Sequence, residues 1–235
     1  MVATQSQERE CIVPQPIPLF LAAMLFMPVA AAGQGAATPA RQERAVFPAT
    51  DECRVEPRTT AELVALTGTP IPVGEMEQQE PFAERMAAMV AEFDAPRAEP
   101  VDAQTVSGVE ATIRELYACV NARDGLAALA LVSDEALARI SPSDLLLIDG
   151  LFPQDPPPLP ADETVGYEVA GAIGLLPDGS LAAPIQTILP SPDANNPFGT
   201  LSFVWFLRPV GDRFLVDGVL VADPGRTITI YVASP

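Results

Sequence analysis

The sequence predicts an α+β fold, with a group of helices followed by an antiparallel sheet of four or more strands. Three observations support this prediction. Helical periodicity dominates from residue 101 to about residue 152, strand-like apolar runs dominate after residue 164, and a proline-rich stretch, Gln154 to Pro160, separates them. Since helices and strands do not alternate, a parallel sheet is not expected.

Composition excludes several classes of function. The 235 residues carry a net charge of −18, and all 13 basic residues are arginines. A chain this acidic repels nucleic acid and anionic membrane surfaces, so neither is expected as a partner of the folded domain. Because the chain contains no histidine, Ser-His-Asp and Cys-His nucleophiles and His-containing metal sites are impossible.

Three regions are expected along the chain. Residues 1–32 are predicted to be a signal peptide, because the apolar run Ile17 to Ala32 ends in small residues. An N-terminal anchor is the alternative, and in both cases we expect a secreted or extracytoplasmic protein. Residues 33–100 are expected to form a linker rich in Pro, Ala and Gln and an N-terminal extension with short helices. Residues 101–235 are expected to form the α+β domain.

The cysteines suggest a disulfide. Removal of residues 1–32 leaves Cys53 and Cys119, an even number in an oxidising compartment. A Cys53 to Cys119 disulfide closes a loop long enough to stabilise the fold by roughly 4 kcal/mol in the chain-entropy model. The alternative is two unpaired thiols, with Cys119 buried on a helix.

Two helices are predicted in the extension. The first covers Thr60 to Leu66, with Thr59 or Thr60 as its cap. The second covers Pro81 to Phe93, where Phe and Met residues recur at helical spacing and are expected to dock on the domain itself. A lid over a pocket and a partner-binding helix are the alternatives. The two prolines of the segment Pro96 to Pro100 predict a break in secondary structure before the domain.

The domain is predicted to begin with its longest helix. Asp102 is placed to cap it, and apolar residues three and four apart form a continuous face from Thr105 to Asn121. Asp124 caps a second helix, and either Ser133 or Asp134 caps a third. The stretch Leu145 to Phe152 is apolar enough to be buried.

The sheet is predicted from two pairs of apolar runs and one short last strand. Val165 to Leu176 and Leu181 to Leu189 flank a turn sequence, and Pro184 restricts the second run to an edge or a bulge. Phe198 to Val221 reads as a hairpin, and Ile228 to Val232 as a short strand. Alternation along the hairpin predicts that one set of residues faces the long helix: Leu201, Phe203, Trp205 and Leu207.

Two local patterns carry a family resemblance. The first is Asn121-Ala122-Arg123-Asp124-Gly125 between two amphipathic helices, and the second is Phe-Leu-Val-Asp-Gly-Val at residues 214–219. With the order of elements, they make Val101 to Val221 resemble the nuclear-transport-factor-2-like superfamily. The resemblance is greatest to a secreted, functionally uncharacterised branch with one Cys in the first long helix and another in an N-terminal extension. The resemblance implies a curved antiparallel sheet wrapped around a long N-terminal helix, in a cone-like shape with an internal pocket.

The resemblance also suggests a chemistry for that pocket. Catalytic relatives such as ketosteroid isomerases, polyketide cyclases and scytalone dehydratases use Asp, Tyr and often His. Here a Tyr and a carboxylate remain, with Tyr117, Tyr167, Glu168 and Asp217 as candidates. Structural roles are favoured for these residues, with Tyr117 as a packing aromatic at the rim and Asp217 before Gly218 as the mark of a β-bulge. No catalytic residue is therefore assigned. The expected pocket residues are Leu116, Tyr117, Tyr167, Phe203, Trp205 and Asp217.

No metal or cofactor is predicted. Asp193-Ala194-Asn195-Asn196 offers oxygen ligands but lacks the spacing of a calcium loop. Glycine-rich phosphate loops, dinucleotide fingerprints and nucleophile elbows are missing from the sequence.

The leading hypothesis is an exported, non-enzymatic domain that binds a small apolar ligand or a protein partner. The first alternative is an isomerase or dehydratase that uses a carboxylate and a Tyr. The second is a homodimer through the outer face of the sheet, because both faces of Leu201 to Leu207 are apolar.

Overall fold

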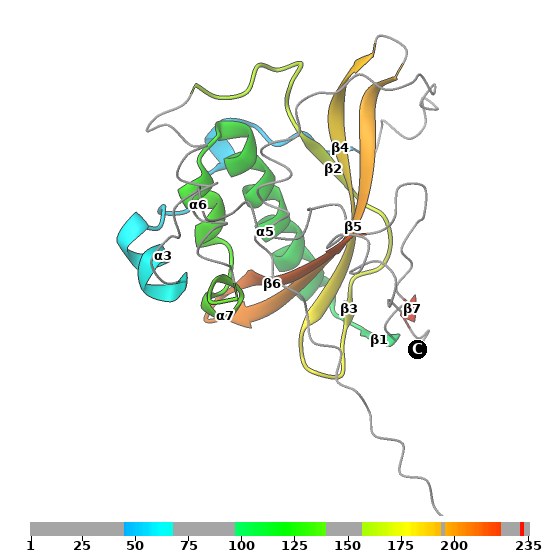
Figure 1. Ribbon diagram of the computed structural model, residues 1–235. Coiled ribbons are helices and arrows are strands. Elements are labelled where there is room, and N and C mark those ends of the chain that lie inside the picture. The colour runs from blue at the N-terminus through cyan, green and yellow to red at the C-terminus, as the bar shows by residue number, and fades with distance from the viewer. Residues whose placement is uncertain (1–44, 68–96, 140–156, 194–195, 222–230, 233–235) are drawn as a thin grey trace, which may run out of the picture.

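The computed structural model describes residues 45–67, 97–139, 157–193, 196–221 and 231–232. The predictions for residues 1–32, for Pro81 to Phe93, for Leu145 to Phe152 and for the middle of the Asp193 to Asn196 loop lie outside these residues. The described chain is α+β, and its helices lie together on one side of the long strands (Figure 1).

Residues 45–67, which we call the extension, contain a 3-10 helix, η1 (Thr50–Glu52), and an α-helix, α3 (Thr60–Thr67). Thr59 caps α3 as predicted. Its hydroxyl accepts a hydrogen bond from the backbone N–H of Glu62 (3.2 Å), and the Glu62 carboxylate accepts one from the backbone N–H of Thr59 (2.7 Å). This reciprocal pair satisfies two backbone donors that an uncapped helix would leave open.

The longest described helix is α5 (Ala103–Ala122), with 20 residues. Asp102 caps it as predicted, accepting a hydrogen bond from the backbone N–H of Thr105 (2.7 Å). Arg123 ends it in the left-handed region, at φ 58°. The predicted apolar face is buried in the core through Val109, Ile113, Leu116 and Val120.

Two shorter helices follow, α6 (Gly125–Ala130) and α7 (Asp134–Leu137). Asp124 caps α6 by accepting from the N–H of Ala127 (2.8 Å), and Ser133 caps α7 by accepting from the N–H of Ala136 (3.0 Å). Both caps agree with the sequence prediction.

The sheet has the strand order β6-β5-β4-β3-β1-β7, and β2 pairs with β4 outside this path. Six strands pair in antiparallel fashion, whereas β7 joins β1 in parallel. The predicted break at Pro96 to Pro100 is wrong, because Arg97–Pro100 forms strand β1. The strands are β1 (Arg97–Pro100), β2 (Gly166–Val169), β3 (Gly174–Leu175), β4 (Leu181–Asp193), β5 (Asn196–Val210), β6 (Arg213–Val221) and β7 (Tyr231–Val232).

Strand β4 corrects two further predictions. The run Val165 to Leu176 is not one strand but two, β2 and β3, which pair with successive parts of β4. Pro184 is not at an edge, because it lies between β5 on one side and these two strands on the other. Its carbonyl accepts from the N–H of Ala170, the residue after β2 (2.8 Å). Since the N and C=O of one residue face the same neighbour, the missing N–H of Pro184 faces the gap between β2 and β3 and costs no bond to β5.

The predicted hairpin of β5 and β6 is confirmed, as is its inward face. Phe203, Trp205 and Leu207 belong to the main core with the apolar face of α5, and Trp205 is 0% exposed. Val204 and Phe206 on the opposite face are also buried, in a smaller cluster with Ala98 and Ala182. Side chains of β5 are therefore buried on both faces of the sheet.

Helix α5 contacts the sheet most closely at β6. Gly108 lies against the ring of Phe214, where an added Cβ would come within 2.4 Å of a ring carbon. The hydroxyl of Thr112, one turn along, donates to the Phe214 carbonyl (3.0 Å). These contacts fix the helix across the hairpin. Among the described residues, no helix combines the length and hydropathy needed to cross a membrane.

Candidate functional site

Four elements bring three aromatic side chains and one threonine together in the core. Tyr117 comes from α5, Tyr167 from β2, Thr187 from β4 and Trp205 from β5, and we call these four residues the tyrosine cluster. All four are buried, and the rings of Tyr117 and Tyr167 are 4.9 Å apart between centroids. The cluster thus places three hydroxyls and an indole N–H in the apolar core.

The hydroxyl of Tyr117 forms a short hydrogen bond with the hydroxyl of Thr187. Burial raises the pKa of Tyr117, and the bond to Thr187 only partly opposes this. The nearby Trp205 indole lowers the pKa of Tyr117 slightly, although its N–H has no hydrogen bond of ordinary geometry to a described residue. Tyr117 is therefore a neutral hydrogen-bonding group at physiological pH, not a phenolate.

Tyr167 lies in a more polar setting than Tyr117. The pKa of Tyr167 is raised to about 12, chiefly by burial; Arg114 opposes this rise, and Glu110 and Glu52 contribute to it. Its neighbour Glu168 is only partly buried, as alternation along a strand predicts. Tyr167 is thus the member of the cluster that lies in the field of surface charges.

Five of the six expected pocket residues share one core. Leu116 and Phe203 pack in the same cluster as Tyr117, Tyr167 and Trp205. The Phe203 and Trp205 rings lie 6.1 Å apart between centroids. Asp217, the sixth, lies in a separate polar network.

The extension is attached to the domain beside this cluster. Val46 exchanges two backbone hydrogen bonds with Tyr167 (2.7 and 2.9 Å). The side-chain amide of Asn121 donates to the carbonyls of Pro48 (3.0 Å) and Val165 (3.1 Å), and its oxygen accepts from the N–H of Val165 (2.8 Å). One buried amide therefore joins the extension, the end of α5 and the start of β2.

A covalent bond and ion pairs strengthen this attachment. Cys53 and Cys119 form a disulfide, the pairing that the sequence predicts. Next to it, Arg114 of α5 pairs with Glu52; this hydrogen bond, together with one from the backbone N–H of Ala49, lowers the pKa of Glu52 to about 2.

A third link lies at Arg58, whose guanidinium donates to two backbone carbonyls, those of Leu129 (3.2 Å) and Val132 (3.0 Å). It also pairs with Asp134 (2.7 Å). The extension therefore contacts α5, α6 and α7.

Asp217 occupies a β-bulge in β6. Phe206 pairs with Gly218, but the next residue of β5, Leu207, pairs with Val216, so Asp217 is the extra residue. The expectation that Asp217-Gly218 marks a bulge is confirmed. A bulge redirects its extra side chain away from the regular alternation.

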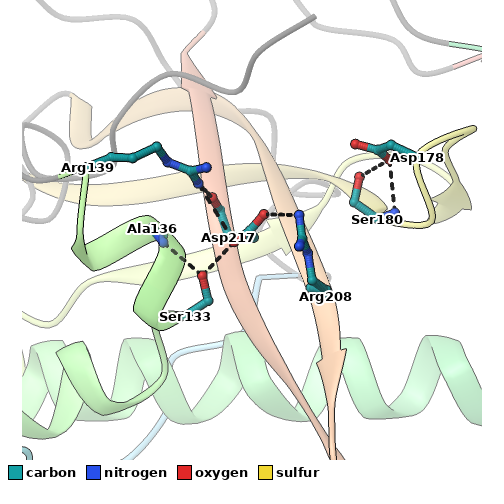
Figure 2. A network of polar contacts seen from close by, with 7 residues as sticks. All are labelled: Ser133, Ala136, Arg139, Asp178, Ser180, Arg208 and Asp217. Carbon is teal, nitrogen blue, oxygen red and sulfur yellow. Dashed lines mark hydrogen bonds and ion pairs between the residues drawn. The ribbon is translucent and has the colours of Figure 1, made fainter. Parts of the chain in front are cut away.

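Three side chains bind the buried Asp217 (Figure 2). Its carboxylate accepts from the Ser133 hydroxyl (2.5 Å) and from Arg208 Nη2 (2.8 Å), while Arg139 Nη2 donates to its backbone carbonyl (2.5 Å). The two guanidinium groups approach Asp217 from opposite sides. Ser133 both caps α7 and donates to Asp217, which one hydroxyl can do because it has a donor and two acceptor positions.

Sequence reasoning missed Thr187, Arg139 and Arg208 as partners of the chosen residues. Arg208 carried a signal, because it is the one charged residue in the run Leu201 to Arg208 of the hairpin. Ser133 was identified as a cap, but its bond to Asp217 joins residues 84 positions apart. Thr187 and Arg139 gave no local signal.

The described residues contain no group of three or more Cys, Asp and Glu side chains arranged to hold a metal ion.

No protein family, curated protein or solved structure matches the chain.

Proposed function

We propose that the chain is an exported domain of the nuclear-transport-factor-2-like type, in which a cone-like sheet binds a small apolar ligand at the tyrosine cluster. The observation that carries this proposal is the burial of Tyr117, Tyr167 and Trp205 in one apolar core between α5 and the sheet. Ligand sites are lined mainly by apolar and aromatic side chains with a few polar groups that fix orientation. The cluster supplies both kinds of group.

The disulfide supports the export part of the proposal. Disulfides persist in oxidising compartments and are rare in the cytosol. Cys53 and Cys119 are joined across 66 residues, so the bond ties a distant extension to the domain. A disulfide in that position is useful to a protein that must keep its fold outside the cell.

Isomerase or dehydratase chemistry has less support. A carboxylate within reach of a tyrosine hydroxyl would favour it, because such a pair can move a proton and stabilise the resulting oxyanion. The described hydrogen bonds connect the Tyr117 hydroxyl to Thr187, whereas Asp217 binds Ser133 and Arg208. Binding without chemistry is therefore the function that we propose.

Dimerisation through the outer face of the sheet also has less support. Val204 and Phe206, the apolar residues that prompted it, are 0% and 8% exposed in the single chain. A dimer interface would need apolar area that a partner can cover.

The test uses Trp205, which is the only tryptophan and is fully buried. The exported protein is titrated with the neutral apolar fluorophore N-phenyl-1-naphthylamine, and energy transfer from Trp205 is measured. We expect the energy transfer from Trp205 to saturate as the fluorophore is added. We also expect the transfer to fall when an apolar compound from a lipid extract competes for the site. Native mass spectrometry of the purified protein tests for a co-purified ligand.

Two neighbouring alanines of β4 provide a matched pair of variants. Ala183 faces the core of the tyrosine cluster opposite Trp205, whereas Ala182 faces the other side of the sheet, and both are 0% exposed. Both Ala→Leu changes add the same volume to a packed site and cost stability. We expect Ala183→Leu to reduce fluorophore binding at least tenfold and Ala182→Leu to leave it within about twofold, a discrimination of about 1 kcal/mol. Absence of saturable transfer in the unchanged protein, or equal losses in the two variants, would refute the proposal.

A further inference from the structure

The charges around Asp217 are unbalanced. One buried carboxylate, with 2% of its side chain exposed, faces two arginines. Arg208 Nη2 lies 2.8 Å from one carboxylate oxygen, and Arg139 Nη2 lies 3.7 Å from the other. Since a guanidinium remains charged at any physiological pH, this group carries one excess positive charge. The other described ion pairs, Arg58 with Asp134 and Arg114 with Glu52, match one arginine to one acid.

The same group has a buried donor without an acceptor. Arg139 Nε is buried and has no hydrogen-bond partner among the described residues. More than nine in ten buried polar groups in folded proteins are paired, and an exception calls for an explanation such as a bound ion. Asp217 does not supply the acceptor, because its carboxylate accepts from Ser133 and Arg208, and its backbone carbonyl accepts from Nη2 of Arg139 instead.

Both arginines can be reached from solvent. The side chains of Arg139 and Arg208 are 32% and 45% exposed. Together they offer up to ten N–H donors, five on each planar guanidinium, and few of these are used by Asp217. The chain's net charge of −18 repels anions at long range, but salt screens such repulsion beyond about 8 Å at physiological ionic strength. The local excess of positive charge therefore decides what binds here.

We propose that Arg139 and Arg208 form a binding site for an oxyanion, with Asp217 as the fixed counter-charge that orients the two guanidinium groups. The ligand class is a group with two or more oxygens on one central atom, which guanidinium recognises through paired N–H donors. A phosphate, a sulfate and a carboxylate share this chemistry. The site is separate from the tyrosine cluster and does not depend on the function proposed for it.

The experiment titrates the full chain with sodium phosphate, sodium sulfate or sodium acetate by calorimetry, with sodium chloride keeping the ionic strength constant. We expect saturable one-to-one binding of at least one oxyanion. Tighter phosphate or sulfate binding identifies a tetrahedral ligand, and tighter acetate binding identifies a carboxylate. Binding that does not saturate, or heats equal to those of added chloride, overturns the proposal.

Three single variants locate the site. Arg139→Gln and Arg208→Gln each remove one guanidinium, and we expect each to weaken binding at least tenfold. Arg114→Gln is the control, because it removes an exposed arginine from a one-to-one pair and should change the affinity less than twofold. Trp205 emission verifies that each variant is folded. An equal loss of binding in Arg114→Gln overturns the proposal, since it would mean a general charge effect.

Discussion

The extension and strand β6 are both held against the helices, but by different means. In residues 45–67 the buried residues are Pro48, Leu63 and Thr67, and this segment is linked to α5 by a disulfide. In β6 the run from Leu215 to Val219 is buried throughout, and its links to α7 are non-covalent: backbone hydrogen bonds of Val216 and the network of Asp217. A segment that buries little apolar surface needs a cross-link to offset its chain entropy. A well-packed strand does not need a cross-link, so its polar contacts can instead orient side chains.

The largest effect is expected from the disulfide. Replacing Cys53 and Cys119 together by Ala should lower the free energy of unfolding by roughly 4 kcal/mol, since the bond closes a loop across 66 residues. Urea denaturation followed by Trp205 emission measures this change. The double variant is compared with Glu52→Gln, which removes only an ion pair of the same extension. If both lose the same stability, non-covalent contacts hold the extension, and the proposed difference between the extension and β6 is wrong.

The next largest effect is expected at Asp217. Asp217→Ala leaves two guanidinium groups without their carboxylate and should cost about 3 kcal/mol, as the loss of one partner of a buried ion pair does. Asp217→Asn should cost less, because the amide keeps an acceptor for Ser133. Asp178→Ala is the control, since the exposed Asp178 accepts, among the described residues, from Ser180 alone, in its own turn. Equal losses at Asp217 and Asp178, measured in urea, would show that the network contributes little to β6.

The smallest effect is expected from Glu52. Its hydrogen bond with Arg114 holds its pKa at about 2, below the ordinary 4.5. Ionised Glu52 therefore stabilises the fold above about pH 4.5, and this contribution is lost as the pH falls towards 2. Because Arg114 is half exposed, we expect a loss of about 1 kcal/mol or less. The difference in stability between Glu52→Gln and the unchanged protein should shrink over this range of pH, and a constant difference would contradict the assignment.

Local features of the fold could be predicted from sequence. The caps at Asp102, Asp124 and Ser133 depend on residues three positions apart, and the inward face of β5 depends on simple alternation. The disulfide followed from cysteine number, and the bulge from Asp217-Gly218. Each of these signals is either a pattern within a few residues or, for the disulfide, the number of cysteines.

The errors share a physical cause, which is pairing between distant segments. Arg97–Pro100 forms a strand only because β3 and β7 pair with it. The partners of Asp217 and Tyr117 likewise come from other elements. Ser133 lies 84 positions from Asp217, and Thr187 lies 70 positions from Tyr117. A sequence pattern cannot show which polar residue will meet another when the contact depends on the whole topology.

Pro184 has a consequence for how β2 and β3 are positioned. Two short strands that share one long partner could slide along it, and a slip by two residues would keep every side chain on its proper face. The backbone of Pro184 faces this pair of strands, where its carbonyl accepts a hydrogen bond from Ala170, but it has no N–H to donate. A slip that moved either strand past this position would forfeit a ladder bond. The proline therefore acts as a stop between them and keeps Tyr167 opposite Thr187.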